Sequence, residues 1–150
     1  MRALLQRVSQ ASVAVQGNVL GEISKGLVVL LGIGSEDTQE DADWLCRKIS
    51  NMRLFPDEDL VMNLNIMQAQ GAFLVISQFT LQASTQKGNR PSYIKAARPA
   101  EAEPLYEYFK DRLCSECGQD IQSGIFGADM QVQLINDGPV TIWIDSKNRE

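Results

Sequence analysis

The sequence predicts one domain of mixed α/β class (mixed α+β) that spans residues 1–150. Its length suits a single domain, and 44% of its 150 residues are apolar, which is enough to build a core. The expected strands outnumber the helices, and hairpins are mixed with crossover connections. This order differs from the regular strand–helix alternation of a doubly wound fold.

The first third of the chain carries strand signals. Residues 8–15 alternate between apolar and polar side chains, and a turn at Gly17–Asn18 is followed by a second apolar stretch. The first 23 residues therefore predict a hairpin. A continuous apolar run at 27–33 predicts a strand buried on both faces, and residues 72–76 predict another.

Two helices are expected. The first is capped by Asp37 or Thr38, has acidic residues in its first turns and basic residues near its end, and shows helical spacing of apolar residues from Ala42 to Ile49. The second spans about 99–117, with Pro104 in its first turn.

The remaining segments are shorter. Residues 52–55 predict a strand stopped by Pro56, and residues 57–68 look irregular. Residues 130–134 alternate as a strand, the turn residues at 136–139 are expected to break it, and 140–145 predict a final strand.

The chain contains no histidine. This excludes Ser-His-Asp and Cys-His triads, a histidine general base and every metal site with a histidine ligand. Cys46, Cys114 and Cys117 are too few for a tetrahedral zinc site, and the Cys114–Cys117 pair ends a helix, whereas redox pairs usually begin one. We therefore expect incidental thiols, no metal and no cofactor.

Nothing in the sequence predicts a membrane protein or an exported one. The longest apolar run, at 27–33, is far too short to cross a membrane, and polar residues interrupt the N-terminal stretch where a signal peptide would be apolar. A cytoplasmic location is the expectation.

Charge is unevenly distributed. The net charge is −5, yet residues 83–100 contain four cations and no acid. A local basic stretch on an acidic body is suited to holding a phosphate backbone at one place, and a solvated loop with scattered charges is the alternative. The four cations are Lys87, Arg90, Lys95 and Arg98.

Two polar segments are candidates for a site. Ser77–Thr80 follows a buried strand, where hydroxyls, an amide and free backbone N–H groups meet a rigid edge. Gly138–Pro139 lies between two expected strands, and such a bond can be cis. On spacing alone, an ordinary strand end and an ordinary turn are the favoured explanations of the two segments.

Taken together, four motifs resemble one family. They are SQFTL at 77–81, NDGPVT at 136–141, an early pattern of Arg7, Val8, Ala11 and Val13, and KGNRPSY at 87–93. The sequence is similar to the D-aminoacyl-tRNA deacylases (the D-tyrosyl-tRNA deacylase family) over essentially its whole length. The resemblance implies a compact barrel-like sheet with two main helices and a homodimer with active sites at the subunit interface. The implied reaction is hydrolysis of the ester that joins a D-amino acid, or a mischarged glycine, to the terminal adenosine of tRNA.

The resemblance also implies roles for residues. Ser77, Gln78, Phe79 and Thr80 would form the catalytic pocket. A Gly-cisPro dipeptide, Gly138–Pro139, would enter the pocket of the partner subunit, bind the substrate and reject L-aminoacyl groups, and Arg7 would hold its orientation. The four cations of the basic stretch would bind the acceptor stem of tRNA.

Two alternatives remain open at this point. A related editing domain would act on a mischarged L-aminoacyl-tRNA, although the intact SQFTL with Arg7 favours the D-specific family. A non-catalytic tRNA-binding module would also explain the basic stretch, and in that case the two motifs would be ordinary strand ends.

Overall fold

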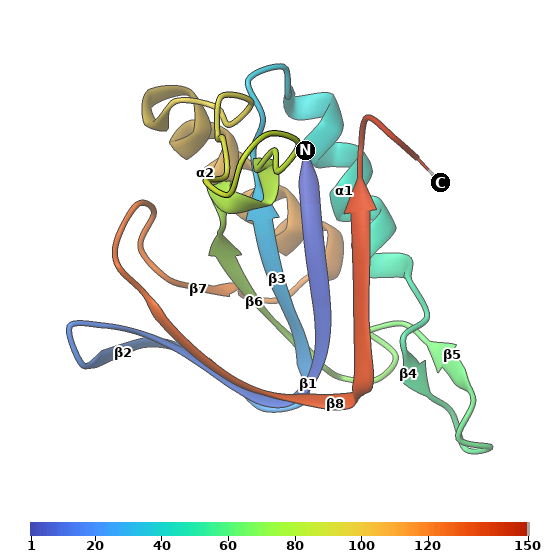
Figure 1. Ribbon diagram of the computed structural model, residues 1–150. Helices are drawn as coiled ribbons and strands as arrows, with labels where there is room; N and C mark the ends of the chain where they lie inside the picture. Colours follow the sequence, from blue (N-terminus) through green and yellow to red (C-terminus); the bar gives the residue numbers. More distant parts are fainter. Residues whose placement is uncertain (150) are drawn as a thin grey trace.

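The computed structural model describes residues 1–149, which form one curled sheet with two helices packed inside the curl (Figure 1). The six strands of the sheet run in the order β2-β1-β3-β6-β7, with β8 on the second side of β1. They are β1 (Arg2–Val15), β2 (Asn18–Ile23), β3 (Gly26–Gly32), β6 (Ala72–Ser77), β7 (Gln122–Ser123) and β8 (Gln131–Asp145). The helices are α1 (Gln39–Asn51) and α2 (Pro99–Cys117).

Strand β1 organises the sheet because it is long enough to pair with three strands. Its first half is antiparallel to β3, its second half is antiparallel to β2, and β8 follows it along the other side. The predicted hairpin is present, but its turn is centred on Gln16–Gly17, one residue earlier than expected. Both residues have positive φ (50° and 80°), the conformation that a two-residue hairpin turn requires.

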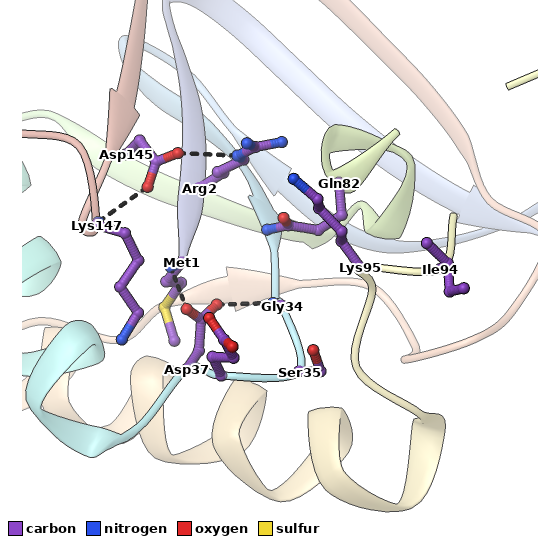
Figure 2. A pocket seen from close by; sticks show the side chains of 11 residues that line it. Met1, Arg2, Gly34, Ser35, Asp37, Gln82, Ile94, Lys95, Asp145 and Lys147 are labelled. Atoms are coloured by element: carbon purple, nitrogen blue, oxygen red, sulfur yellow. Dashed lines mark hydrogen bonds and ion pairs between the residues drawn. The ribbon is translucent and has the colours of Figure 1, made fainter. Parts of the chain in front are cut away.

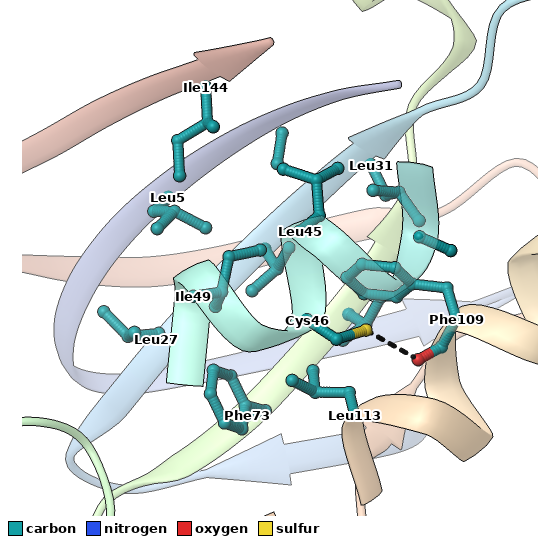
Figure 3. Close-up of a cluster of buried hydrophobic side chains, with 14 of the residues drawn as sticks. Leu5, Leu27, Leu31, Leu45, Cys46, Ile49, Phe73, Phe109, Leu113 and Ile144 are labelled. Carbon is teal, nitrogen blue, oxygen red and sulfur yellow. Dashed lines mark hydrogen bonds between the residues drawn. The ribbon is translucent and has the colours of Figure 1, made fainter. Parts of the chain in front are cut away.

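The centre of the sheet is parallel. Strands β3 and β6 pair in parallel through the crossover helix α1, and both are buried, as their continuous apolar runs predicted. Leu27 and Phe73 meet the apolar faces of α1 and α2, which contribute Ile49 and Phe109 (Figure 3). This shared core ties the end of β6 to a rigid scaffold.

Buried ionic contacts join helix α1 to the end of the chain. Asp41, only 4% exposed, accepts hydrogen bonds from the Thr38 amide (2.9 Å), the Ser146 hydroxyl (2.8 Å) and the Lys147 amine (2.8 Å). Burial alone would raise the pKa of Asp41, but these hydrogen bonds outweigh burial and hold the pKa well below its usual value. Asp41 therefore stays ionised and fixes the segment after β8 against α1.

A small hairpin differs from the expectation for residues 52–68. It consists of β4 (Phe55–Pro56) and β5 (Met62–Leu64), so the prediction of irregular structure over 57–68 was wrong for the second strand. The Asp57 carboxylate closes the turn by accepting the amide hydrogens of Asp59 (3.0 Å) and Val61 (3.1 Å).

Strand β8 continues through the segment that was expected to break it. Gln6 pairs with Thr141 and Val8 pairs with Asn136, so residues 137–140 form a bulge within one strand. The Asn136 side chain spans the bulge by accepting the Val140 amide hydrogen (2.8 Å) and donating to the Thr141 hydroxyl (3.0 Å). Local side-chain hydrogen bonds thus preserve the pairing that the turn residues would otherwise end.

Neither helix in the described part of the chain combines the length and apolar character needed to span a membrane.

Candidate active site

The SQFTL segment lies where two parallel strands end. Ser77 is the last residue of β6 and pairs with Leu31 of β3, and the Gln78 amide donates to the Leu31 carbonyl (2.7 Å). The chain then turns into a 3₁₀ helix, η1 (Phe79–Gln82). Gly32 permits this turn, because a Cβ there would lie 2.7 Å from Leu81 Cβ and 2.9 Å from the Gln78 carbonyl oxygen.

Two side chains hold η1 against the sheet. The Arg2 guanidinium donates to the Leu81 carbonyl (2.9 Å), and the buried Gln82 amide donates to the Gly32 carbonyl (2.9 Å). Both anchors replace hydrogen bonds that the strands no longer supply once β3 and β6 end. The segment that carries the candidate catalytic groups is therefore held from both sides.

Within the segment, Gln78 and Thr80 are joined. The Gln78 amide nitrogen lies 2.5 Å from the Thr80 hydroxyl and donates to it. An amide donor cannot accept the hydroxyl proton, and no carboxylate or amine is hydrogen-bonded to Thr80 among residues 1–149. This arrangement favours a positioning role for Thr80 over a nucleophilic one.

The first turn of η1 leaves two backbone donors uncommitted. Within the part of the chain that the structure describes, no acceptor meets the N–H groups of Phe79 and Thr80, whereas the Leu81 and Ala83 amides donate to the Gln78 and Thr80 carbonyls. Neighbouring N–H groups of this kind can stabilise an oxyanion.

A cavity of about 640 Å³ opens beside the SQFTL segment. Ser77, Gln78 and Phe79 line it, and Phe79 is 57% exposed with its ring edge against Tyr93 (centroids 5.1 Å apart). The other walls come from β3, the start of α2, the segment before β8 and β8 itself. Tyr93, Phe126 and Met130 also line this cavity and were not predicted from the sequence. Of these three residues, only Tyr93 belongs to a sequence motif, the KGNRPSY segment.

Gly138 and Pro139 are exposed on the β8 bulge, and the peptide bond between them is cis. The buried Arg7 side chain holds the bulge, because its Nε donates to the Asp137 carbonyl (3.0 Å) and its Nη1 donates to the Leu54 carbonyl (2.6 Å). Gly138 has φ of 134°, and a Cβ there would lie 2.9 Å from Arg7 Nη2. Arg7 therefore binds the residue that precedes the dipeptide, and its guanidinium lies beside Gly138.

The two motifs do not meet within one chain. Gly138 lies beside Arg7, which pairs with Leu27, whereas Ser77 pairs with Leu31, four residues further along the same strand. Three strand spacings across and four residues along give a separation of roughly 20 Å along the surface of the sheet. In Figure 1, β8 bends beside the middle of β1, away from the N-terminus.

The four cations of the basic stretch are all exposed, and none has an ion-pair partner among residues 1–149. Lys87 and Arg90 lie in a loop closed by reciprocal backbone hydrogen bonds between Ser84 and Ser92 (2.8 and 2.9 Å). Arg98 lines the large cavity, and Lys95 lines a second cavity next to it.

Burial disfavours the thiolate form of Cys46 and Cys117. Burial raises the pKa of Cys117 to about 11, with a further contribution from the Glu116 charge, so this thiol stays protonated near neutral pH. The described residues contain no cluster of His, Cys, Asp or Glu side chains arranged to hold a metal ion.

Comparison with known proteins identifies the family of this chain. A family model described as D-Tyr-tRNA(Tyr) deacylase matches residues 4–145. The chain belongs to this deacylase family. Its relatives include the D-aminoacyl-tRNA deacylases of Flavobacterium johnsoniae (61% identical) and Bacteroides fragilis (57% identical), and each alignment covers 100% of both chains. The sequence resemblance is thereby confirmed, as is the prediction of an ester hydrolase.

Solved structures agree on the deacylase fold. A protein described as c-Myc DNA Unwinding Element Binding Protein is 43% identical, with a TM-score of 0.92 over 97% of this chain and 98% of that one. A probable eukaryotic D-amino acid tRNA deacylase is 16% identical with a TM-score of 0.83 over 95% and 97%, and it supports the fold alone. The prediction of a barrel-like mixed sheet with two helices is confirmed.

Proposed function

We propose that this deacylase hydrolyses the ester bond of D-aminoacyl-tRNA and releases free tRNA and the D-amino acid, and that it also removes glycine from mischarged tRNA. Family membership supports the reaction class. The observation that carries the proposal is the 640 Å³ cavity bounded by Ser77, Gln78 and Phe79, next to the uncommitted N–H groups of Phe79 and Thr80. A tRNA substrate also favours the cytoplasm as the place of action.

The catalytic step follows from these groups. The N–H groups of Phe79 and Thr80 stabilise the oxyanion that forms when water attacks the ester carbonyl. Thr80, fixed by Gln78 at 2.5 Å, positions the substrate. No side-chain base is hydrogen-bonded to Thr80 in the described chain, so the ribose 2′-hydroxyl beside the ester helps to activate the water.

Hydrolysis is therefore expected to depend on the substrate's own hydroxyl. A D-tyrosyl-tRNA ending in 2′-deoxyadenosine should be cleaved about 100-fold more slowly than the normal substrate, the lower range for loss of general acid–base assistance. Single-turnover rates on the two substrates measure the difference. Equal rates, or an acyl-enzyme trapped on Thr80 but absent from Thr80→Val, would contradict this mechanism.

We propose that the active enzyme is a homodimer in which Gly138–Pro139 completes the partner's site. The dipeptide is exposed on a bulge and lies roughly 20 Å, by strand spacing, from the SQFTL segment of its own chain. Among the described residues, β8 has no strand on its outer side and exposes Val132, Ile135 and Trp143. Long edges with exposed apolar side chains are surfaces that pair with another chain.

The same dipeptide supplies a chirality filter. Backbone carbonyls of Gly138 and Pro139 accept hydrogen bonds from the α-ammonium group of the substrate. Once that group is fixed, the Cβ of an L-residue collides with the carbonyls, whereas a D-residue points its side chain away. Glycine has no Cβ and is therefore accepted.

The basic stretch is proposed to bind the acceptor end of the tRNA. Lys87, Arg90, Lys95 and Arg98 are exposed and have no ion-pair partner among residues 1–149, and Arg98 lines the cavity. The chain as a whole carries a net charge of −5. Phosphate contacts of this kind add affinity irrespective of the amino acid and weaken with salt.

Matched D- and L-tyrosyl-tRNA distinguish the candidate functions. We expect release of D-tyrosine with at least about 100-fold preference over L-tyrosine, because a collision with backbone carbonyls costs several kcal/mol. The measurement is the rate of deacylation of each ester under single-turnover conditions. Turnover of the L-ester would indicate the related editing activity, and binding without turnover would indicate a tRNA-binding module.

A further inference from the structure

A second cavity, of about 300 Å³, lies on the other side of η1 from the catalytic cavity. Gln82 at the end of η1 lines it, together with the loop after β3 and the ends of β1 and β8 (Figure 2). Lys95 also lines it, while the next two residues, Ala96 and Ala97, line the catalytic cavity. The short helix η1 and the backbone of residues 95–97 therefore separate the two cavities.

Three uncommitted donors line this second cavity. Among the described residues, Lys95 has no ion-pair partner and the Ser35 hydroxyl makes no hydrogen bond. Within the same residues the Arg2 guanidinium, which lies over the Trp143 ring at 5.6 Å, donates hydrogen bonds only through Nε and Nη1. In Figure 2 the Lys95 amine and the Arg2 guanidinium point towards one another. Two cations and a hydroxyl in this arrangement are typical of a site for a phosphate oxygen.

The acidic side chains around the cavity are already neutralised or lie at its rim. The Asp145 carboxylate accepts from Arg2 Nε (2.9 Å) and from the Lys147 amide (2.9 Å). Asp37 accepts from the Met1 amino group (2.5 Å) and from the Gly34 amide (2.7 Å). Glu36 is exposed and makes no ion pair within residues 1–149, and the Lys147 amine is bound to Asp41. Among residues 1–149, Lys95 is thus the one cation of the lining without an ion pair to a carboxylate.

We infer that this cavity, through Lys95, Arg2 and Ser35, binds a phosphate group at the 3′ end of the tRNA while the ester occupies the neighbouring catalytic cavity. The inference rests on the proposed function and names the group that Lys95 recognises. The thin partition between the cavities suits the short distance between an ester on a terminal ribose and the phosphate on the 5′ side of the same nucleotide. Arg2 links the two, because it donates to the Leu81 carbonyl at the end of the catalytic segment.

Short substrates with and without phosphate test the inference. The wild-type enzyme should hydrolyse D-tyrosyl esters of adenosine 5′-monophosphate and of cytidylyl-adenosine about tenfold better, in kcat/KM, than the D-tyrosyl ester of adenosine, as one charge-assisted hydrogen bond provides. Lys95→Gln should remove most of this preference by raising KM for the phosphate-bearing esters, with little change for the nucleoside ester.

Lys25→Gln is the matched control. Lys25 is exposed at the opposite end of β3 and has no ion-pair partner in the described chain, so its replacement should leave all three rates unchanged. A wild-type enzyme without preference for phosphate, or a Lys95→Gln variant impaired equally on all esters, overturns the inference. Failure of the wild-type enzyme to cleave D-tyrosyl-tRNA would instead overturn the proposed function.

Discussion

Replacing Gly138 with alanine is expected to lower kcat/KM for D-tyrosyl-tRNA by about 100-fold or more, the loss that a displacement of about 1 Å in a site can cause. The added Cβ would lie 2.8 Å from Val140 Cγ2 and 2.9 Å from Arg7 Nη2, at a φ of 134° that L-residues rarely adopt. Arg7 is itself held by the Leu54 carbonyl at 2.6 Å, so the dipeptide must move. Deacylation rates measure the loss.

Gly17→Ala is the control for this substitution. Gly17 also has positive φ (80°), but a Cβ there has no atom within 4 Å, and the residue lies in the β1–β2 turn. The control should cost roughly 1 kcal/mol of stability, the penalty for an L-residue at positive φ, and leave the deacylation rate unchanged. If Gly138→Ala retained full activity in folded protein, the proposed role of the dipeptide would be wrong.

The second large effect is expected in mixed dimers. Gly138→Ala and Gln78→Ala should each inactivate the homodimer, the second because it releases Thr80. A heterodimer of the two variants should recover about half of the wild-type activity, because one of its two sites combines an intact SQFTL segment with an intact dipeptide. Two different affinity tags allow the heterodimer to be purified and assayed.

The mixed dimer separates two architectures that single variants cannot distinguish. If each site used residues of one chain only, every site in the heterodimer would carry a defect and no activity would return. Dimers of Gly138→Ala carrying both tags provide the background, and they should stay inactive. Recovery above that background would place the two motifs in one site across the subunit boundary.

Local sequence signals predicted most of the elements correctly, because each depends on neighbouring residues. The apolar runs of β3 and β6 and the acidic start of α1 all correspond to observed elements. Pro104, expected in the first turn of α2, instead lies inside the helix, which begins at Pro99. The prediction failed at residues 136–139. There the Asn136 side chain and the pairing partner β1 carry one strand through a segment whose residue types are typical of a turn.

The candidate site was predicted in part. The SQFTL and Gly-Pro motifs were identified from the sequence, since their residue types and separation are specific to a family. Tyr93, Phe126 and Met130 were not, because a residue that lines a cavity only through tertiary packing leaves no periodic signal. The contacts of Arg2 with Leu81 and Asp145 were also invisible, because they join segments 79 and 143 residues apart.

The sequence by itself determined the fold class, the absence of histidine chemistry and the family, because composition, periodicity and motif identity are local properties. Only the tertiary structure decided that the Gln78 amide donates to the Thr80 hydroxyl and that the Arg7 guanidinium lies beside Gly138. It also decided that the SQFTL and Gly-Pro motifs lie far apart within one chain. The last two facts depend on strand register and on which side chains meet across the sheet, whereas the Gln78–Thr80 hydrogen bond depends on the 3₁₀ turn that follows β6. Register is set by packing between segments far apart in the sequence, so no single segment encodes it.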